Sequence, residues 1–217
     1  MIERKKLIET PSQTAGPFLH IGCTPSITGI NIFKDELGIT PFKNIAPDEA
    51  INIKGKIYDG NNDPIIDAMI ETWQCDKNGK YLSYQGFSRR VTDFETGDYH
   101  LKTIRPGNEI NEDGTISPSY ILFWIVARGM NRPLITRMYF DENDLKNDVI
   151  VNSLNIQDRY KTLIPYTEDE KNFIFDIYLQ GKKETIFFEF YVIVNYAQVK
   201  LNYSTIPILH KGNIGRK

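Results

Sequence analysis

The sequence predicts an all-β sandwich with an irregular N-terminal arm and short helices, on the basis of three observations. About eight short stretches are rich in β-branched and aromatic residues, turn signals such as DGNN and KNG separate them, and almost no stretch has helical periodicity. The 217 residues suffice for one large β domain, and no low-complexity linker divides them. We expect one domain over 1–190, followed by an extension, 191–217, that is either an added edge strand or hairpin or an unstructured tail.

Composition excludes several classes of partner. The formal net charge is −2, from 26 basic and 28 acidic residues that are interspersed, so neither nucleic acid nor an anionic membrane is an expected ligand. The N-terminus lacks an apolar signal region, and no apolar run approaches the length of a membrane span, which predicts a cytoplasmic protein. Cys23 and Cys75 are too few for a disulfide scaffold, and we interpret both as reduced structural thiols.

The N-terminal stretch TPSQTAGPFLHIG, residues 10–22, predicts an extended arm with a kink. Pro11 and Pro17 disfavour helix at the residues before them. The small residues Thr14, Ala15 and Gly16 allow the backbone to approach a ligand or a partner closely, or the arm lies on its own domain. The following residues, 24–48, lack periodicity and predict an irregular connection.

Alternation of apolar and polar residues predicts the strands that follow. They are expected at about 51–58, 66–74, 98–104, 119–129 and 133–140, with turns at 59–62, 76–79 and 105–107. Asp141 predicts the N-cap of a short helix over 142–146. The stretches 172–180 and 184–190 flank a turn at 181–183 and predict a β-hairpin.

The stretch SYILFWIVARG, 119–129, predicts a central strand that is buried on both faces. Alternation places Tyr120, Leu122, Trp124, Val126 and, without a bulge, Arg128 on one side of it. The strand therefore delivers one guanidinium at its C-terminal end. This group is either a functional arginine or a solvated residue at a strand end.

Several motifs in this order resemble the intradiol ring-cleavage dioxygenases, specifically the α subunits of their heteromeric members. The resemblance covers about residues 8–190 and rests on TPSQTAGPFLHIG, TIRPG, FWIVARG and RYKTLI taken together. It implies a β-sandwich and an assembly with a β subunit that carries non-haem Fe(3+) on two tyrosines and two histidines. It also implies that the assembly cleaves 3,4-dihydroxybenzoate with O2 to 3-carboxy-cis,cis-muconate.

The resemblance also implies that this chain lacks those metal ligands. The two histidines of the iron-binding chains, spaced as HxH, correspond here to Tyr120 and Leu122, and one ligand tyrosine corresponds to Glu109. The loop of the other ligand tyrosine is shortened, so neither Tyr81 nor Tyr84 can be assigned to it. We therefore expect no metal ligand and no catalytic residue in this chain.

The resemblance implies that this chain contributes to a substrate pocket shared with the β subunit, and that the β subunit holds the iron of this pocket. The implied substrate-binding residues are Thr14, Gly16, Pro17, Phe18 and Arg128. Tyr120 and Arg128 lie roughly 27 Å apart along one strand, so Arg128 serves a neighbour's site and not one around Tyr120. A guanidinium suits a ring carboxylate, although an interface salt bridge is the alternative role.

Two other function classes stay open from sequence. One is a non-catalytic β-sandwich interaction module, which the missing ligands permit. The other is a homodimeric intradiol enzyme for catechol or hydroxyquinol, which requires its own two tyrosines and two histidines. The histidines at positions 20, 100 and 210 have no metal-ligand spacing, which disfavours that second class.

Overall fold

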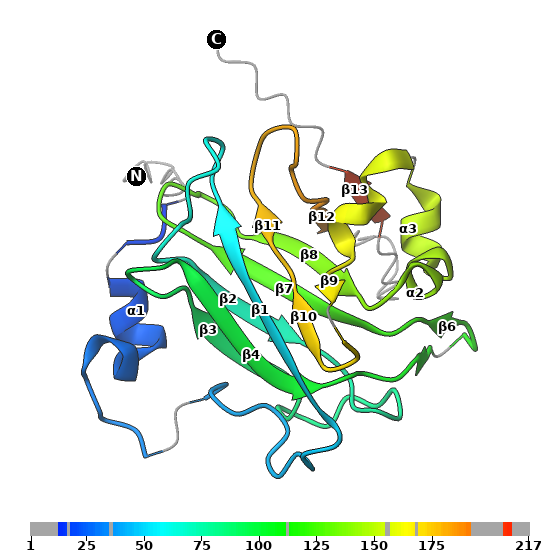
Figure 1. Cartoon of the computed structure of the whole chain (residues 1–217), viewed down its shortest axis with the longest axis horizontal. Coiled ribbons are helices and arrows are strands. Elements are labelled where there is room, and N and C mark those ends of the chain that lie inside the picture. Colours follow the sequence, from blue (N-terminus) through cyan, green and yellow to red (C-terminus); the bar gives the residue numbers. More distant parts are fainter. Residues whose placement is uncertain are drawn as a thin grey trace, which may run out of the picture.

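The computed structural model of the chain describes residues 13–16, 18–34, 37–111, 113–154, 157–167, 169–191 and 206–209. Its centre is a pair of packed β-sheets (Figure 1). In the first sheet, the long strand β1 pairs antiparallel with β4 on one side and parallel with β10 and β11 on the other. This sheet contains β1 (Ala50–Tyr58), β4 (Asp98–Ile104), β9 (Tyr166–Thr167), β10 (Asn172–Ile174) and β11 (Ile177–Tyr178).

The second sheet has six strands in the order β13-β12-β8-β7-β2-β3. Its strands are β2 (Met69–Trp73), β3 (Phe87–Val91), β7 (Tyr120–Val126), β8 (Leu134–Tyr139), β12 (Phe188–Tyr191) and β13 (Ile206–Leu209). A separate two-stranded ribbon joins β5 (Glu109–Ile110) to β6 (Ile116–Ser117). The sandwich predicted from the sequence is confirmed, with β7 in the interior of its sheet as expected.

The main core lies between the two sheets. Ile121, Phe123 and Ile125 of β7 are fully buried against the first sheet. The Phe123 ring contacts Tyr99 and Phe175 at centroid distances of 6.2 and 5.2 Å. The other side chains of β7 are only half-buried, so the expectation of complete burial on both faces is wrong for one face. Shorter elements, rather than a third sheet, cover that face.

The expected hairpin of 172–180 with 184–190 forms only at its turn, 181–183, where the Thr185 N–H donates to the Tyr178 carbonyl at 2.9 Å, and the strands on either side do not pair with each other. β10 and β11 pair with β1, and the chain then crosses to the second sheet, where β12 pairs with β8. Gly55 permits the close approach of β1 to the residues between β10 and β11, because a Cβ there would lie 2.1 Å from the Phe175 carbonyl oxygen. Alternation alone does not identify the partner of a strand.

Short helices lie at two sides of the sandwich (Figure 1). On one side are α1 (Phe18–Cys23) and the 3₁₀ helix η1 (Pro25–Thr28), and on the other are α2 (Glu142–Lys146), α3 (Val149–Ser153) and the 3₁₀ helix η2 (Gln157–Leu163). Asp141 caps α2 as predicted, accepting hydrogen bonds from the backbone N–H groups of Asn143 and Asp144. The arm is extended only before α1, because a proline disfavours helix before it but is compatible with a helix that follows.

A second apolar cluster lies under α2, α3 and η2. It includes Leu145, Val151, Leu163, Ile186 and Phe188. Beyond 190, β13 forms an added edge strand on β12, whereas residues 192–205 and 210–217 of the expected extension fall outside the described residues. Among the described residues, no helix has the length and apolar character needed to cross a membrane.

Candidate functional site

The N-terminal arm lies along the C-terminal end of β7. The hydroxyl of Thr14 accepts a hydrogen bond from the backbone N–H of Gly129 at 2.7 Å. Next to it, Ala15 forms a parallel β-bridge with Arg128. Two segments more than a hundred residues apart in sequence therefore meet at this end of the strand. The structure brings Thr14, Gly16 and Arg128 together at this end of β7.

A cavity of about 400 Å³ opens beside this contact. Its walls are mainly apolar, and its ionisable groups come from Arg128, Asp67 and His20. The residues that line it are Ala15, Gly16, Leu19, His20, Ile21, Thr28, Ile66, Asp67, Phe94 and Arg128. The volume falls within the range of small-molecule sites. Phe18 is 80% exposed and does not line the cavity, and Pro17 lies outside the described residues.

Arg128 is paired with Asp67 in the cavity wall. The Nε of Arg128 donates to Oδ2 of Asp67 at 2.7 Å, and Nη2 donates to the same oxygen. The arginine side chain is 72% exposed, whereas that of Asp67 is 18% exposed. Sequence reasoning did not identify Asp67, because it lies 61 residues before Arg128 and carries no motif.

A second polar cluster lies at the opposite end of β7, around Tyr120. The Tyr81 phenol lies near that of Tyr120, and its ring stacks on Trp73 at a centroid distance of 6.0 Å. Partial burial, together with Tyr120, raises the pKa of Tyr81 above its usual range. Tyr84, by contrast, is 72% exposed. Of the two tyrosines that the sequence left unassigned, Tyr81 is the one that reaches Tyr120.

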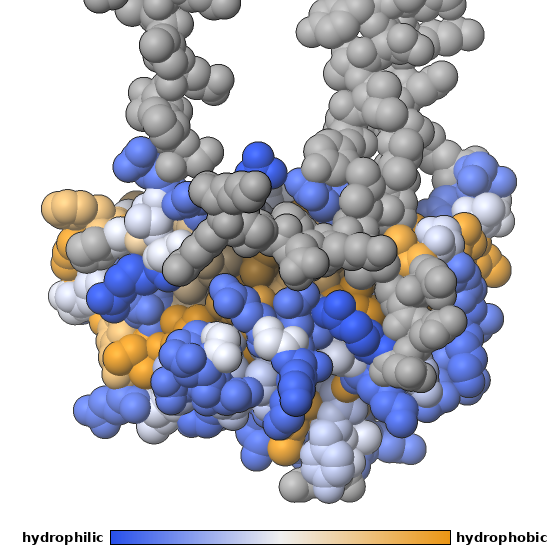
Figure 2. All heavy atoms as spheres, turned by 90° about the horizontal axis from the view of Figure 1, so that it is seen from above, coloured by the Kyte–Doolittle hydropathy of each residue, from blue (hydrophilic) through white to orange (hydrophobic). Residues whose placement is uncertain are grey.

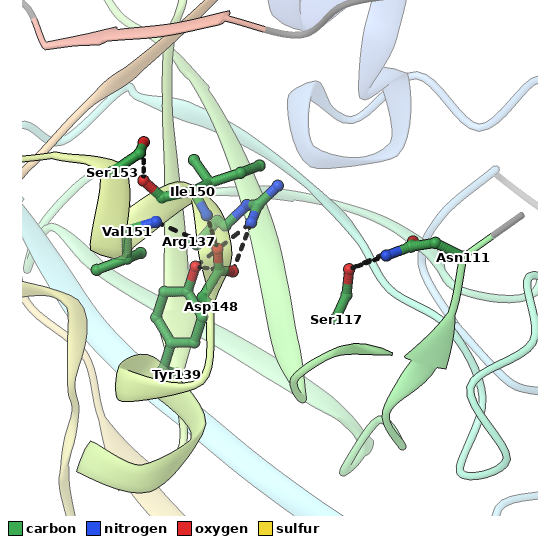
Figure 3. Close-up of polar contacts among 8 residues, drawn as sticks. All are labelled: Asn111, Ser117, Arg137, Tyr139, Asp148, Ile150, Val151 and Ser153. Carbon is green, nitrogen blue, oxygen red and sulfur yellow. Dashed lines mark hydrogen bonds and ion pairs between the residues drawn. The ribbon is translucent and has the colours of Figure 1, made fainter. Parts of the chain in front are cut away.

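Arg137 is the centre of this cluster (Figure 3). In the β7–β8 register, Arg137 lies opposite Leu122 and Tyr139 lies opposite Tyr120. The guanidinium carbon lies 4.1 Å from the centroid of the Tyr120 ring, which is a cation–π contact. The Arg137 side chain is only 8% exposed. A buried cation therefore packs on the ring at the first of the positions that correspond to the HxH histidines, and its residue is the cross-strand partner of the second.

Asp148 supplies the counter-charge to Arg137. Its Oδ2 accepts from Nη1 of Arg137 at 2.8 Å and from the Tyr139 hydroxyl at 2.7 Å. Its Oδ1 caps α3 by accepting from the backbone N–H groups of Ile150 and Val151 at 2.7 and 3.2 Å (Figure 3). One carboxylate thus joins the sheet to the helices that cover it. Burial raises the pKa of Tyr139, so its hydroxyl remains a donor.

Glu109 lies near the same cluster, at the start of β5. Burial raises the pKa of the Cys75 thiol to about 11, and the Glu109 carboxylate adds to this effect. The Cys75 thiol also donates to the Gly107 carbonyl at 3.3 Å. Glu109 and Tyr120 thus both lie near Tyr81.

Comparison with known proteins defines the class. Residues 31–181 match the family model described as Dioxygenase, so the chain belongs to the intradiol dioxygenase family. The protocatechuate 3,4-dioxygenase alpha chain of Pseudomonas putida is 36% identical over 196 residues, covering 85% of this chain and 98% of that one. The alpha chain of Burkholderia cepacia is 28% identical over 84% and 98%, whereas the beta chain of that organism is 28% identical over only 45% and 47%.

Solved structures agree on the fold. The 3-chlorocatechol 1,2-dioxygenase of Rhodococcus opacus 1CP has a TM-score of 0.53 at 20% identity, covering 68% of each chain. The catechol 1,2-dioxygenase of Pseudomonas arvilla C-1 has a TM-score of 0.52 at 18% identity, covering 65% of this chain and 55% of that one. The β-sandwich is therefore of the intradiol dioxygenase type.

The family uses non-haem iron, but the cluster around Tyr120 does not fit such a metal. Leu122 offers no donor atom to a metal. The Arg137 guanidinium against Tyr120 adds a fixed positive charge. In the described part of the chain, no three His, Cys, Asp or Glu side chains are grouped so that they could hold a metal. His20 and His100 belong to separate elements, and His210 lies outside the described residues.

Proposed function

We propose that this chain is the α subunit of a heteromeric intradiol dioxygenase that cleaves protocatechuate, 3,4-dihydroxybenzoate, with O2 to 3-carboxy-cis,cis-muconate. In this proposal a β subunit holds the Fe(3+), and the present chain completes the substrate pocket. The observation that carries the proposal is the placement of Arg128 beside the arm, at the edge of an apolar cavity. The end-to-end similarity to alpha chains supports it.

The proposed substrate-binding residues are Thr14, Gly16, Pro17, Phe18 and Arg128. A benzoate needs apolar walls for its ring and a cation for its carboxylate, and the cavity offers both. Gly16 has no heavy atom within 4 Å of a Cβ built at its position, which leaves space beside the arm for a ligand or partner. The exposed ring of Phe18 would be covered by the partner.

Exposed apolar side chains around the arm support a partner on this side. Between 18 and 39, the exposed large hydrophobic residues are Phe18, Ile21, Ile27, Ile30, Ile32, Phe33, Leu37 and Ile39. Figure 2 shows apolar surface at the left edge of the molecule, the side on which Figure 1 places α1. Apolar surface of this extent is typical of a protein interface.

The first prediction concerns metal content. The chain purified alone is expected to hold no stoichiometric iron and to develop no catecholate-to-iron colour with substrate, because the cluster around Tyr120 offers an unsuitable donor set. Elemental analysis of the isolated chain and of its complex with a β subunit measures this directly. Close to one tightly held iron per isolated chain would refute the assignment of the metal to the partner.

The second prediction concerns assembly. Co-expression with a β subunit is expected to give a stable hetero-oligomer whose interface buries more than about 1,000 Å². The double substitution Ile32→Asp with Phe33→Asp should weaken assembly, because it would place two charges in an apolar interface. Both side chains are exposed in the isolated chain, so its own fold should tolerate the change. Size-exclusion chromatography with light scattering reports the outcome.

The matched control for assembly is Ile110→Asp with Ile116→Asp. These two residues are equally apolar and exposed, but they belong to the β5–β6 ribbon on the other side of the molecule (Figure 1). The control is expected to assemble normally. Separate peaks for the two unmodified subunits would contradict the proposal, and equal loss in both double variants would remove the arm from the interface.

A further inference from the structure

We infer that Asp67 is a positioning residue for recognition of the substrate carboxylate, acting through Arg128. The inference rests on the proposed role of Arg128 and extends it to a residue to which neither the motifs nor the family resemblance assigned any role. Asp67 holds one edge of the guanidinium and leaves the other edge available to a carboxylate ligand.

The geometry of the pair divides the guanidinium into two edges. Nε and Nη2 of Arg128 both donate to Oδ2 of Asp67. Among the described residues, none accepts a hydrogen bond from Nη1 of Arg128. The edge formed by Nη1 and Nη2 therefore remains able to meet a carboxylate with two parallel hydrogen bonds.

Asp67 is itself held firmly, so it can act as a fixed support. Its backbone carbonyl accepts from Nε2 of His20 at 3.1 Å, which connects it to α1. The next residue, Ala68, is fully buried and exchanges hydrogen bonds with Thr92, whose hydroxyl accepts from the Ala68 N–H at 2.9 Å. Asp67 thus stands at the entry to β2 with its backbone anchored on both sides.

Holding Arg128 in advance favours binding for an entropic reason. A free arginine side chain samples many rotamers and loses that freedom when it closes on a ligand. Arg128 is 72% exposed, so packing alone does not restrict it, and the ion pair with Asp67 is its main restraint among the described residues. Ordering the guanidinium before the substrate arrives lowers the entropic cost of binding.

The negative charge of Asp67 also repels the carboxylate of the substrate. Asp67 could therefore either position Arg128 for the substrate or compete with the substrate for Arg128, and these two roles predict opposite results. If Asp67 positions Arg128, removing it raises KM for a carboxylated substrate. If Asp67 competes for Arg128, removing it lowers that KM. The first role is favoured because Asp67 occupies only one edge of the guanidinium and binds it through a single oxygen.

The test measures steady-state kinetics of the chain assembled with an iron-bearing β subunit, using protocatechuate and catechol as substrates. Asp67→Ala is expected to raise KM for protocatechuate about three- to tenfold, the effect of leaving one long side chain unordered. It should leave kcat within about twofold and leave KM for catechol unchanged. Asp67→Asn retains a side-chain acceptor and should recover most of the loss.

A double-mutant cycle with Arg128→Ala separates the possible outcomes. In the Arg128→Ala background, Asp67→Ala should have no further effect on KM for protocatechuate. A lower KM in Asp67→Ala, equal changes for both substrates, or an effect that persists without Arg128 would each overturn the positioning role. Asp63→Ala serves as the control, because Asp63 lies in the preceding loop and its carboxylate forms no hydrogen bond or ion pair with a described residue.

The same cycle distinguishes failure of the inference from failure of the proposed function. If Arg128→Ala raises KM for protocatechuate more than KM for catechol, and Asp67→Ala shows no such difference, only the positioning role of Asp67 is wrong. If Arg128→Ala affects both substrates alike, Arg128 does not recognise the carboxylate, and both the role of Arg128 and the role of Asp67 are rejected.

Discussion

Replacing Arg137 with alanine is expected to lower the free energy of unfolding by about 3–5 kcal/mol, the usual cost of removing one partner from a buried ion pair. The Asp148 side chain is 3% exposed, so its charge would remain buried with only the Tyr139 hydroxyl and two backbone N–H groups as donors. Urea denaturation followed by tryptophan fluorescence measures the change. Trp73 and Trp124 lie on neighbouring strands and report on this sheet.

Two further variants show whether charge is the cause. The double variant Arg137→Met with Asp148→Asn removes both charges, and asparagine is also a good N-cap for α3, so most of the lost stability should return. Arg132→Ala breaks an exposed ion pair with Glu189, at 3.4 Å, and should cost less than about 1 kcal/mol. A loss below about 1 kcal/mol in Arg137→Ala would mean that the cluster is not a stabilising element.

Replacing Arg128 with alanine is expected to lower kcat/KM for protocatechuate about tenfold to a hundredfold in the assembled enzyme, mainly through KM. A hydrogen bond to a charged group contributes about 1.5–3 kcal/mol, which corresponds to that range or somewhat more. Catechol lacks the carboxylate, so its kcat/KM should change much less. Assembly and iron content should be unaffected, because in the proposed role the guanidinium meets the substrate and neither the metal nor the partner.

The control for Arg128 is Arg132→Ala, a second exposed arginine in the loop that leads to β8. Its guanidinium pairs with Glu189 and does not line the cavity beside the arm. It should leave the kinetics with both substrates unchanged. Equal losses for protocatechuate and catechol in Arg128→Ala would assign Arg128 to the subunit interface.

Most strands could be predicted from the sequence, because alternation and turn residues are local signals. β1, β4, β7 and β8 begin and end within a few residues of their expected bounds. β3 was missed because its sequence, FSRRV, is largely polar. Its arginines are satisfied by distant groups, for example Arg89 by Glu71 and by the Cys23 carbonyl. Pairing partners were also missed, since a strand's own sequence does not specify which strand lies next to it.

The residues of the candidate site that belong to sequence motifs were predictable, and the others were not. Thr14 and Arg128 belong to segments with recognisable patterns, and the structure places them in contact through Gly129 and Ala15. Asp67 and Asp148 were missed because each is an isolated aspartate whose partner is set by tertiary structure. Asp148 did carry one local signal, as it precedes the apolar residues of α3 in the manner of an N-cap.

The placement of the two polar clusters at opposite ends of β7 has an evolutionary consequence. Residues separated by roughly 27 Å along a strand are energetically independent in most proteins, so substitutions at the two ends should have additive effects. A chain with this layout can lose metal ligands around Tyr120 and acquire a buried ion pair there without disturbing Arg128. In the proposed assembly, one end of the strand can therefore accumulate change while the other end serves the active site of another subunit.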